Sequence, residues 1–345
     1  MSRSATSNTS TNPPEGNWIA SAIEAITEQC RGKTSLLLKA LALPVAGLLI
    51  FLFIWQGAAN SIDTSLGKFP GPSQVYQQSV SLLQEHSAER DKEVAFYQRQ
   101  EVRNAKKLAK LQQTDPGATV RVRPYTGKPT FIDQIGTSLV TVLAGFFAAS
   151  LIAIPVGIMI GLNSALYSAL NPLIQLFKPV SPLAWLPLVT MVVSAVYVSD
   201  DPMFAKSFVT SMITVSLCCL WPTMINTAVG VSSISQDLKN VSQVLRLPFM
   251  THVIKIVLPS SIPMMFTGLR LSLGIAWMVL IAAEMLAQNP GLGKFVWDEF
   301  QNGSSNSLGR IMVAVLVIGL IGYLLDRVML QIQRRVSWDK SAVLR

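Results

Sequence analysis

Cysteine, histidine and charge are all scarce in this chain of 345 residues. It contains three cysteines and two histidines, and Asp, Glu, Lys and Arg together make up 14% of the sequence. Cys218 and Cys219 are neighbours inside an apolar run and Cys30 stands alone, so neither a disulfide framework nor a CxxC metal site is expected. His86 and His252 leave little for metal binding or acid–base catalysis.

Hydrophobic residues are abundant instead, at 50% of the chain, and the mean hydropathy is +0.43. This composition is too apolar for an ordinary soluble domain. The net charge of +9 does not indicate nucleic-acid binding, because Lys and Arg also gather at the edges of membrane spans. Basic and aromatic residues do not alternate at a spacing typical of nucleic-acid binding. The polar N-terminal segment does not resemble a cleaved signal peptide.

Six apolar runs are each close to the ~20 residues that a spanning helix needs. They cover about 35–56, 135–162, 181–199, 204–230, 262–287 and 308–331. We therefore expect an all-α, polytopic membrane bundle with six transmembrane helices. Ala153, Gly157 and Gly161 repeat at every fourth residue, the small-residue spacing that lets helix backbones approach closely in lipid.

The polar segments divide the chain further. Residues 1–34 are expected to be a cytoplasmic, partly disordered tail, and 57–130 a periplasmic insertion with amphipathic helices. A core with the five remaining spans covers 131–337, with a short, proline-broken connection at 163–180. Residues 338–345 would be a second cytoplasmic tail.

Lys and Arg near the ends of the spans predict the orientation. The short loops expected outside, 199–205 and 288–307, contain only Lys294 away from their edges. The insertion carries eleven Lys and Arg and would also lie outside, but long segments are translocated largely regardless of charge. We therefore expect both termini in the cytoplasm.

A polar but patterned segment, DLKNVSQVLRLPFMTHVIKIVLPSSIP, runs from Asp237 to Pro263. A helix is predicted over 235–247, because its apolar residues share one face. That face consists of Leu238, Val241, Val244 and Leu245. Ser235 can cap the start, Asp237 suits the first turn, and Pro248 discourages continuation.

A second short helix is predicted from about Met250 to Val257, ended by Pro259. Two short helices joined at an angle would form a compact knob on the cytoplasmic side. One interpretation is an interfacial helix lying on the membrane, and the other is a helix that seats in the groove of a partner protein. The apolar face lacks the Trp and Phe of interfacial anchors, which favours the partner.

The segment resembles the cytoplasmic EAA loop of bacterial ABC importer permeases, in which EAA is followed by Gly and then by I-x-L-P. Ile256, Leu258 and Pro259 match the end of that pattern. At its start, Asn240, Val241 and Ser242 stand for Glu-Ala-Ala, and Arg246 stands for Gly.

Further segments extend the resemblance over roughly 131–337. GLRLSLGIAWMVLIAAEML, NPGLGKFVWDEFQNGS and GYLLDRVMLQIQRR resemble the nitrate, taurine and bicarbonate branch of these permeases. The NVSxVLRL form of the loop is most similar to the nitrate permeases.

The resemblance implies a MetI-like fold that works as a dimer, expected to be a homodimer, in the bacterial inner membrane. Each copy would seat its loop, 235–261, in a separate ABC ATPase subunit, and a periplasmic or lipid-tethered binding protein would deliver a small anion. The residues assigned to ATPase coupling are Asp237, Leu238, Asn240, Val241, Ser242, Leu245, Arg246, Ile256, Leu258 and Pro259. This chain has no GxxxxGK[ST] loop, so no cofactor is expected in it and ATP would bind to the partner. Nitrate or nitrite is the first expectation; cyanate, bicarbonate and sulfonates such as taurine remain open.

A stripe of residues along the fifth span is the candidate translocation pathway. It consists of Thr267, Arg270, Gly274, Trp277 and Glu284, which advance by helical steps. Intramembrane charges usually face a bundle interior or a wet cavity. Arg270 could instead snorkel to the interface, and Glu284 could be a structural partner or gate element rather than a ligand.

Three rival classes are less consistent with the sequence. An intramembrane protease needs His and Ser, or paired Asp, within the spans, whereas both histidines lie outside them and Asp326 has no such companion. A sensor or scaffold would carry an added signalling domain. An autonomous channel would not need the cytoplasmic knob.

Overall fold

The computed structural model describes residues 42–64, 67–111, 119–198, 203–304 and 306–336, which belong to two units divided between Ile62 and Asp63. The two expected tails lie outside the described residues. The first unit contains the helix Ala42–Ser61, which is long and apolar enough to cross a membrane. This helix extends five residues beyond the predicted run, which was expected to end at Gln56.

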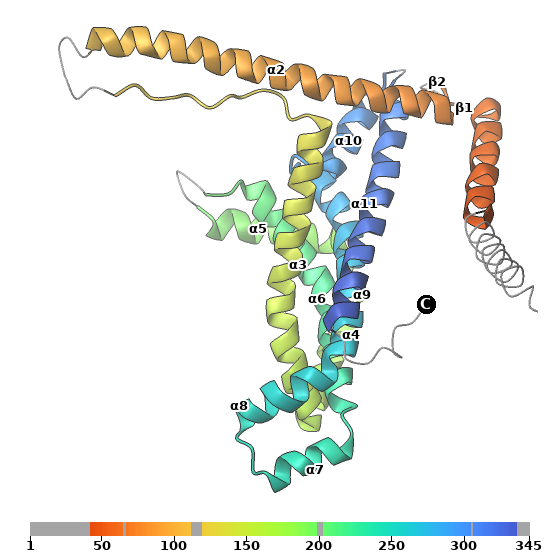
Figure 1. Cartoon of the computed structure of the whole chain (residues 1–345), viewed down its shortest axis with the longest axis vertical. Helices are drawn as coiled ribbons and strands as arrows, with labels where there is room; N and C mark the ends of the chain where they lie inside the picture. Colours follow the sequence, from red (N-terminus) through yellow and green to blue (C-terminus); the bar gives the residue numbers. More distant parts are fainter. Residues whose placement is uncertain (1–41, 65–66, 112–118, 199–202, 305, 337–345) are drawn as a thin grey trace, which may run out of the picture. The chain divides into compact units, whose positions relative to one another are not determined.

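The second unit is almost entirely helical (Figure 1). Its elements are β1 (Asp63–Thr64), β2 (Gly67–Lys68), α2 (Pro72–Leu111), α3 (Phe131–Leu162), α4 (Ser164–Phe177), α5 (Pro182–Val196), α6 (Lys206–Ser232), α7 (Gln236–Val244), α8 (Phe249–His252), the π-helical turn η1 (Val253–Val257), α9 (Leu258–Ala287), α10 (Leu292–Asn302) and α11 (Ser307–Val336). β1 and β2 form one two-residue antiparallel pair, the only strands in the described part of the chain. The prediction of an all-α helical bundle is therefore confirmed.

Small residues let α3, α6 and α9 pack closely. A Cβ added to Gly161 of α3 would lie 2.6 Å from the Val231 Cβ of α6, and one added to Gly268 of α9 would lie 2.7 Å from the Asn226 Cβ. The predicted repeat at Ala153, Gly157 and Gly161 therefore does face another helix. Close backbone approach is the usual basis of helix association where lipid supplies no hydrophobic driving force.

The contacts also fix the direction of each helix. Gly145 of α3 meets Val215, and Gly161 meets Val231, so α3 and α6 are parallel. The chain must therefore cross back between Leu162 and Lys206. It does so through α4 and α5, which meet at a bend of 99°. Together they are long and apolar enough to cross a membrane.

The apolar run expected over 181–199 corresponds to α5 and is not a complete span by itself. α5 has only 15 residues, and Pro179 and Pro182 separate it from α4. Five helices are each long and apolar enough to span a membrane, and counting the bent α4–α5 pair as one broken span gives six.

Pro222 lies inside α6 and has no N–H to donate. Beside it, the Ser272 side chain of α9 forms hydrogen bonds with two backbone groups of α6. The Ser272 hydroxyl accepts from the Thr223 backbone N–H at 3.1 Å and donates to the Cys219 carbonyl at 2.5 Å. The Thr223 hydroxyl also donates to Ser272 Oγ at 2.7 Å. A side chain inserted into the ladder is a recognised cause of helix kinks, and here it also joins α6 to α9.

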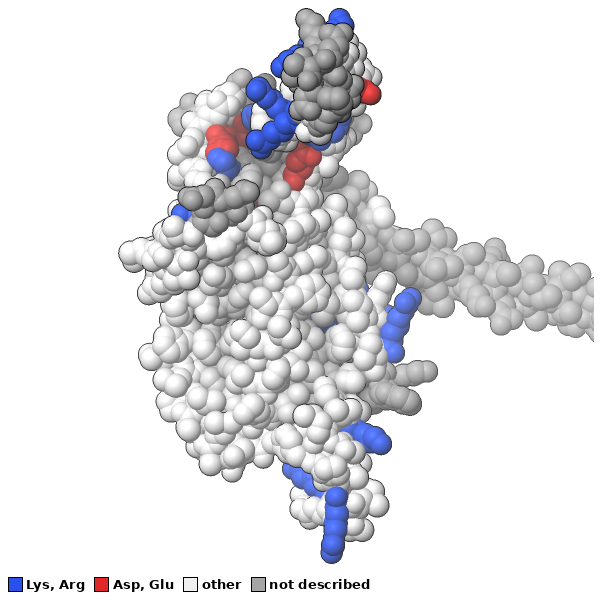
Figure 2. Space-filling model, turned by 90° about the vertical axis from the view of Figure 1, so that its left-hand side faces the viewer, with Lys and Arg blue, Asp and Glu red and all other residues white. Residues whose placement is uncertain are grey.

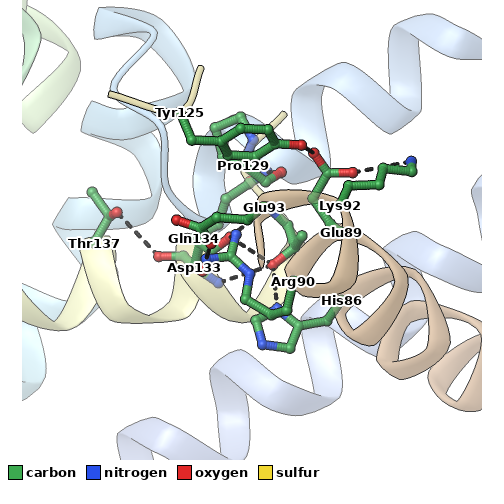
Figure 3. A network of polar contacts seen from close by, with 11 residues as sticks. His86, Glu89, Arg90, Lys92, Glu93, Tyr125, Pro129, Asp133, Gln134 and Thr137 are labelled. Atoms are coloured by element: carbon green, nitrogen blue, oxygen red, sulfur yellow. Dashed lines mark hydrogen bonds and ion pairs between the residues drawn. The ribbon is translucent and has the colours of Figure 1, made fainter. Parts of the chain in front are cut away.

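The predicted insertion is dominated by one 40-residue helix, α2. It is attached to the start of α3, where His86 Nδ1 lies 2.6 Å from the Thr130 hydroxyl and Arg90 pairs with Asp133 at 3.2 Å (Figure 3). The segment that leads back to α3 lies along α2, and the Tyr125 hydroxyl donates to Glu89 at 2.7 Å. This hydrogen bond, with a second from Lys92, lowers the pKa of Glu89.

The distribution of charge agrees with a membrane-spanning bundle. On the face shown in Figure 2, acidic side chains are visible only towards the upper end, where α2 lies. Lys and Arg are visible there and also in the lower half, and a broad surface without charge lies between.

Candidate functional site

The predicted knob is present as α7, α8 and η1, at the end of the bundle opposite α2 and α10 (Figure 1). Its expected apolar face is exposed. The exposed fractions are 40% for Leu238, 49% for Val241, 81% for Val244 and 62% for Leu245. Asp237 and Asn240 are also exposed, and Ser235 occupies the N-cap position without a side-chain cap hydrogen bond. An exposed apolar face on a short helix is typical of a surface that another protein covers.

The second half of the knob anchors it to the spans. Ile256 is buried, and the neighbouring Val253 and Val257 form a cluster with Ile158 of α3 and Val231 of α6; Leu258 packs against the same cluster. The residues that match I-x-L-P thus connect α7 and α8 to the bundle. Any displacement of the knob would be passed to α3, α6 and α9.

The prediction that Pro259 ends a short helix was wrong. α8, η1 and α9 continue without a break from Phe249 to Ala287. Pro259 is the second residue of α9 and directly follows η1, so it lies inside this continuous helical segment. The wider π-helical turn just before it accommodates the proline ring.

Two features define the junction between α7 and α8: a left-handed residue and a side-chain hydrogen bond. Arg246 has a φ of 48°, in the left-handed region that favours glycine, so this position requires the backbone freedom that the family pattern meets with Gly. Ser242 is buried, and its hydroxyl lies 2.7 Å from His252 Nδ1. His252 was not predicted as a site residue, because its partner lies ten residues earlier, on the preceding helix.

The residues of the predicted pathway stripe have different surroundings in the structure. Trp277 is buried against α11, where its indole N–H donates to the Ile318 carbonyl at 2.9 Å. Arg270 forms hydrogen bonds to both carboxylate oxygens of Asp326 on α11, at 2.9 to 3.1 Å. This arrangement favours packing for Trp277, and it gives Asp326 a partner that the sequence did not reveal.

The other three candidates have different surroundings. The Thr267 hydroxyl donates to the Pro263 carbonyl of its own helix at 3.0 Å. Gly274 lies on an open face of α9, where an added Cβ would meet nothing within 4 Å, beside the exposed Leu271 and Met278. Gly274 is therefore the candidate that a second copy or a permeating anion could still approach.

Glu284 is a structural partner at the α10 end of the bundle. Its fully buried carboxylate accepts from the Ser138 hydroxyl of α3 at 2.8 and 2.9 Å and from the Gly293 N–H of α10 at 3.0 Å. Ser138 in turn accepts from the Leu292 N–H at 2.9 Å. This cluster joins three helices, which agrees with the structural role considered for Glu284.

Comparison with known proteins identifies relatives of the whole arrangement. Residues 153–338 match the family described as the binding-protein-dependent transport system inner membrane component. The bicarbonate transport system permease protein CmpB of Synechococcus elongatus is 35% identical over 298 residues, which cover 86% of this chain and 90% of that protein. The nitrate import permease protein NrtB of Leptolyngbya laminosa is 36% identical over 208 residues, 60% of this chain and 70% of that protein.

The fold also occurs in a solved structure. A chain of the MetNI methionine ABC transporter, in an inward-facing conformation, matches with a TM-score of 0.50 and 15% identity. The match covers 60% of this chain and 95% of that chain. At this identity the likeness concerns the fold alone, and it agrees with the MetI-like bundle expected from the sequence.

Proposed function

This chain belongs to the family of binding-protein-dependent transport system inner membrane components, and we propose that it is the permease subunit of an ATP-driven importer for small oxyanions, with nitrate as the first candidate substrate. Two copies would enclose the pathway. ABC ATPase subunits would bind on the α7 side, and a substrate-binding protein on the α10 side. In this proposal the chain itself is a transporter subunit and performs no ATP hydrolysis.

The observation that carries the proposal is the exposed apolar face of α7 on an element anchored to the spans. Leu238, Val241 and Leu245 give a partner groove three side chains at helical spacing. Because Val253 and Val257 tie the same element to α3 and α6, movement of the partner can be converted into movement of the bundle. The knob would therefore couple ATP hydrolysis in the partner to transport.

The proposed orientation places α7 in the cytoplasm and α2 in the periplasm of an inner membrane. Five crossings between Phe131 and Val336 begin and end on opposite sides. The helix Ala42–Ser61, as a sixth, would bring both ends of the chain to the α7 side. At that end of the face shown in Figure 2, Lys and Arg are visible without Asp or Glu, which supports a cytoplasmic location.

Bicarbonate is the second candidate substrate, and one observation favours it. A continuous match over 86% of the chain leaves at most 14% for the two ends together, so the match to the bicarbonate permease must include α2. The match to the nitrate permease covers 60%. If α2 takes part in receiving the substrate, the shared insertion indicates bicarbonate.

The test is uptake into proteoliposomes that contain the permease, its ATPase subunits and its binding protein. We expect ATP-dependent accumulation of isotopically labelled nitrate, and a parallel assay with labelled bicarbonate distinguishes the two candidates. Taurine, a larger sulfonate, serves as the third substrate. Uptake of none of these under ATP hydrolysis would contradict the proposed substrate class.

A further inference from the structure

A cavity of about 540 Å³ lies between the knob and the adjoining ends of α3 and α6. The ends of the spans provide an apolar wall that includes Leu162, Val231 and Ile234. The knob provides the polar side, with Lys239, Arg246 and His252 as its basic residues. No carboxylate lines the cavity, so its charged lining is entirely cationic.

The two permanent cations of this lining are Lys239 and Arg246. Within the described residues, no ion pair includes Lys239 or Arg246. Two like charges beside an apolar wall repel each other, and an anion between them would remove that cost. A guanidinium also presents a planar fork of donors that matches two oxygens of a phosphate, carboxylate or nitrate group.

His252 can contribute a third donor. Its Nδ1 is engaged by the Ser242 hydroxyl at 2.7 Å, and Ser242 is itself buried. When Nδ1 accepts from that hydroxyl, the proton of the neutral ring is on Nε2, which is then free to donate. The buried serine would thus hold the ring in the tautomer that suits an anion.

The cavity and the proposed ATPase surface use different faces of α7. Lys239, Ser242 and Gln243 of α7 line the cavity and follow one another by steps of three and one, which places them on one side of the helix. Arg246 follows the end of α7 and lines the same cavity. Leu238, Val241 and Leu245 occupy another side and are exposed. A partner seated on the apolar face would therefore leave the cavity in place.

We propose that this cavity is a binding site for an oxyanion group, held by Lys239, Arg246 and His252, either on a small free anion or at the head of an anionic lipid. Its volume is within the range of sites for small ligands and exceeds what a single nitrate needs, so a phosphate-bearing group is the better fit. A bound anion would tie α7 to α8 and stiffen the knob. That regulatory consequence rests on the proposed function, whereas binding itself does not.

The test uses the full-length permease in detergent, with Lys239→Gln and Arg246→Gly combined in one variant. Glycine suits a φ of 48°, so it removes the guanidinium without straining the backbone. Lys255→Gln is the matched control, because Lys255 is an exposed residue of η1 in the same knob but does not line the cavity. The single Lys239→Gln variant repeats the test if the double variant does not fold.

Two readouts separate the sources of the anion. For a free anion, sodium phosphate at constant ionic strength should raise the thermal midpoint of the wild type and the control with saturation, and the double variant should bind at least about tenfold more weakly. For a lipid, native mass spectrometry should find phosphatidylglycerol retained by the wild type and the control but lost from the double variant. If neither readout distinguishes the double variant from the control, the site does not exist. Neither readout needs transport or ATP, so a negative result leaves the proposed function standing.

Discussion

Gly157 of α3 lies so close to Thr227 of α6 that a Cβ added to the glycine would come within 2.7 Å of the threonine Cβ. The Met224 carbonyl is equally near. A Cβ and a carbonyl oxygen are both fixed by the backbone, so neither can move away unless α6 itself moves. The contact between α3 and α6 thus depends on hydrogen being the only side chain at this position.

We expect Gly157→Ala to destabilise the bundle by about 1–3 kcal/mol, since overpacking a tight contact forces the helices apart. The matched control is Gly319→Ala in α11, where an added Cβ meets nothing within 4 Å. That control should be neutral or slightly stabilising, because alanine is the better helix former. Thermal unfolding of both variants in the same detergent measures the difference. Equal midpoints would contradict the close-approach argument.

Five of the spans follow from the sequence alone, because apolar length is a local property. The bend between α4 and α5 does not, since prolines such as Pro182 mark a break without giving its angle. The left-handed backbone at Arg246 could be anticipated only from the family pattern, which has Gly at this position. Pairs such as Ser138 with Glu284 and Arg270 with Asp326 were not predictable, because periodicity gives the face of each helix but not the helix that it meets.

A cysteine at Gln98 and another at Asn240 test the proposed orientation. Both residues are exposed, one on α2 and the other on α7. In a background without native cysteines, we expect Gln98→Cys to react with an impermeant thiol reagent added to spheroplasts, and Asn240→Cys to react only after lysis. The opposite pattern would place α7 outside the cell and would remove the basis for ATPase coupling.

The apolar face of α7 should be essential for coupling. Val241→Asp or Leu245→Asp would bury a carboxylate in an apolar groove, which is costly unless the charge is paired. Residues at the centre of an interface often contribute about 2 kcal/mol or more, so we expect at least about a tenfold loss of ATPase co-purification or of uptake. Gln236→Asp adds the same charge at an exposed polar position of α7 that is not among the assigned coupling residues, and it should have little effect. Normal assembly and uptake in both test variants would refute the assignment.

Arg270 and Asp326 can be separated by a double-mutant cycle. If their ion pair serves only to join α9 and α11, Arg270→Gln and Asp326→Asn should lower stability to a similar extent, and the double variant should lose little more than either one. If Arg270 also attracts the anion, as expected from the sequence, Arg270→Gln should slow uptake in the Asp326→Asn background as well. Thermal midpoints and initial uptake rates of the four proteins decide between these outcomes.

Trp277 distinguishes a packing role from a pathway role most directly. Its ring is buried against α11 and its N–H is already donated to Ile318, so packing is the role that its contacts favour. Trp277→Ala should then cost about 3–5 kcal/mol of stability and leave anion selectivity unchanged in the protein that does fold. Trp277→Phe keeps most of the ring and loses only the hydrogen bond, so its loss should be about 1–2 kcal/mol. Relative uptake rates of nitrate, bicarbonate and taurine, measured beside unfolding midpoints, provide the test. If Trp277→Phe keeps its stability but leaks or changes its preference among the three anions, the indole lines the pathway in a conformation in which α9 and α11 have separated.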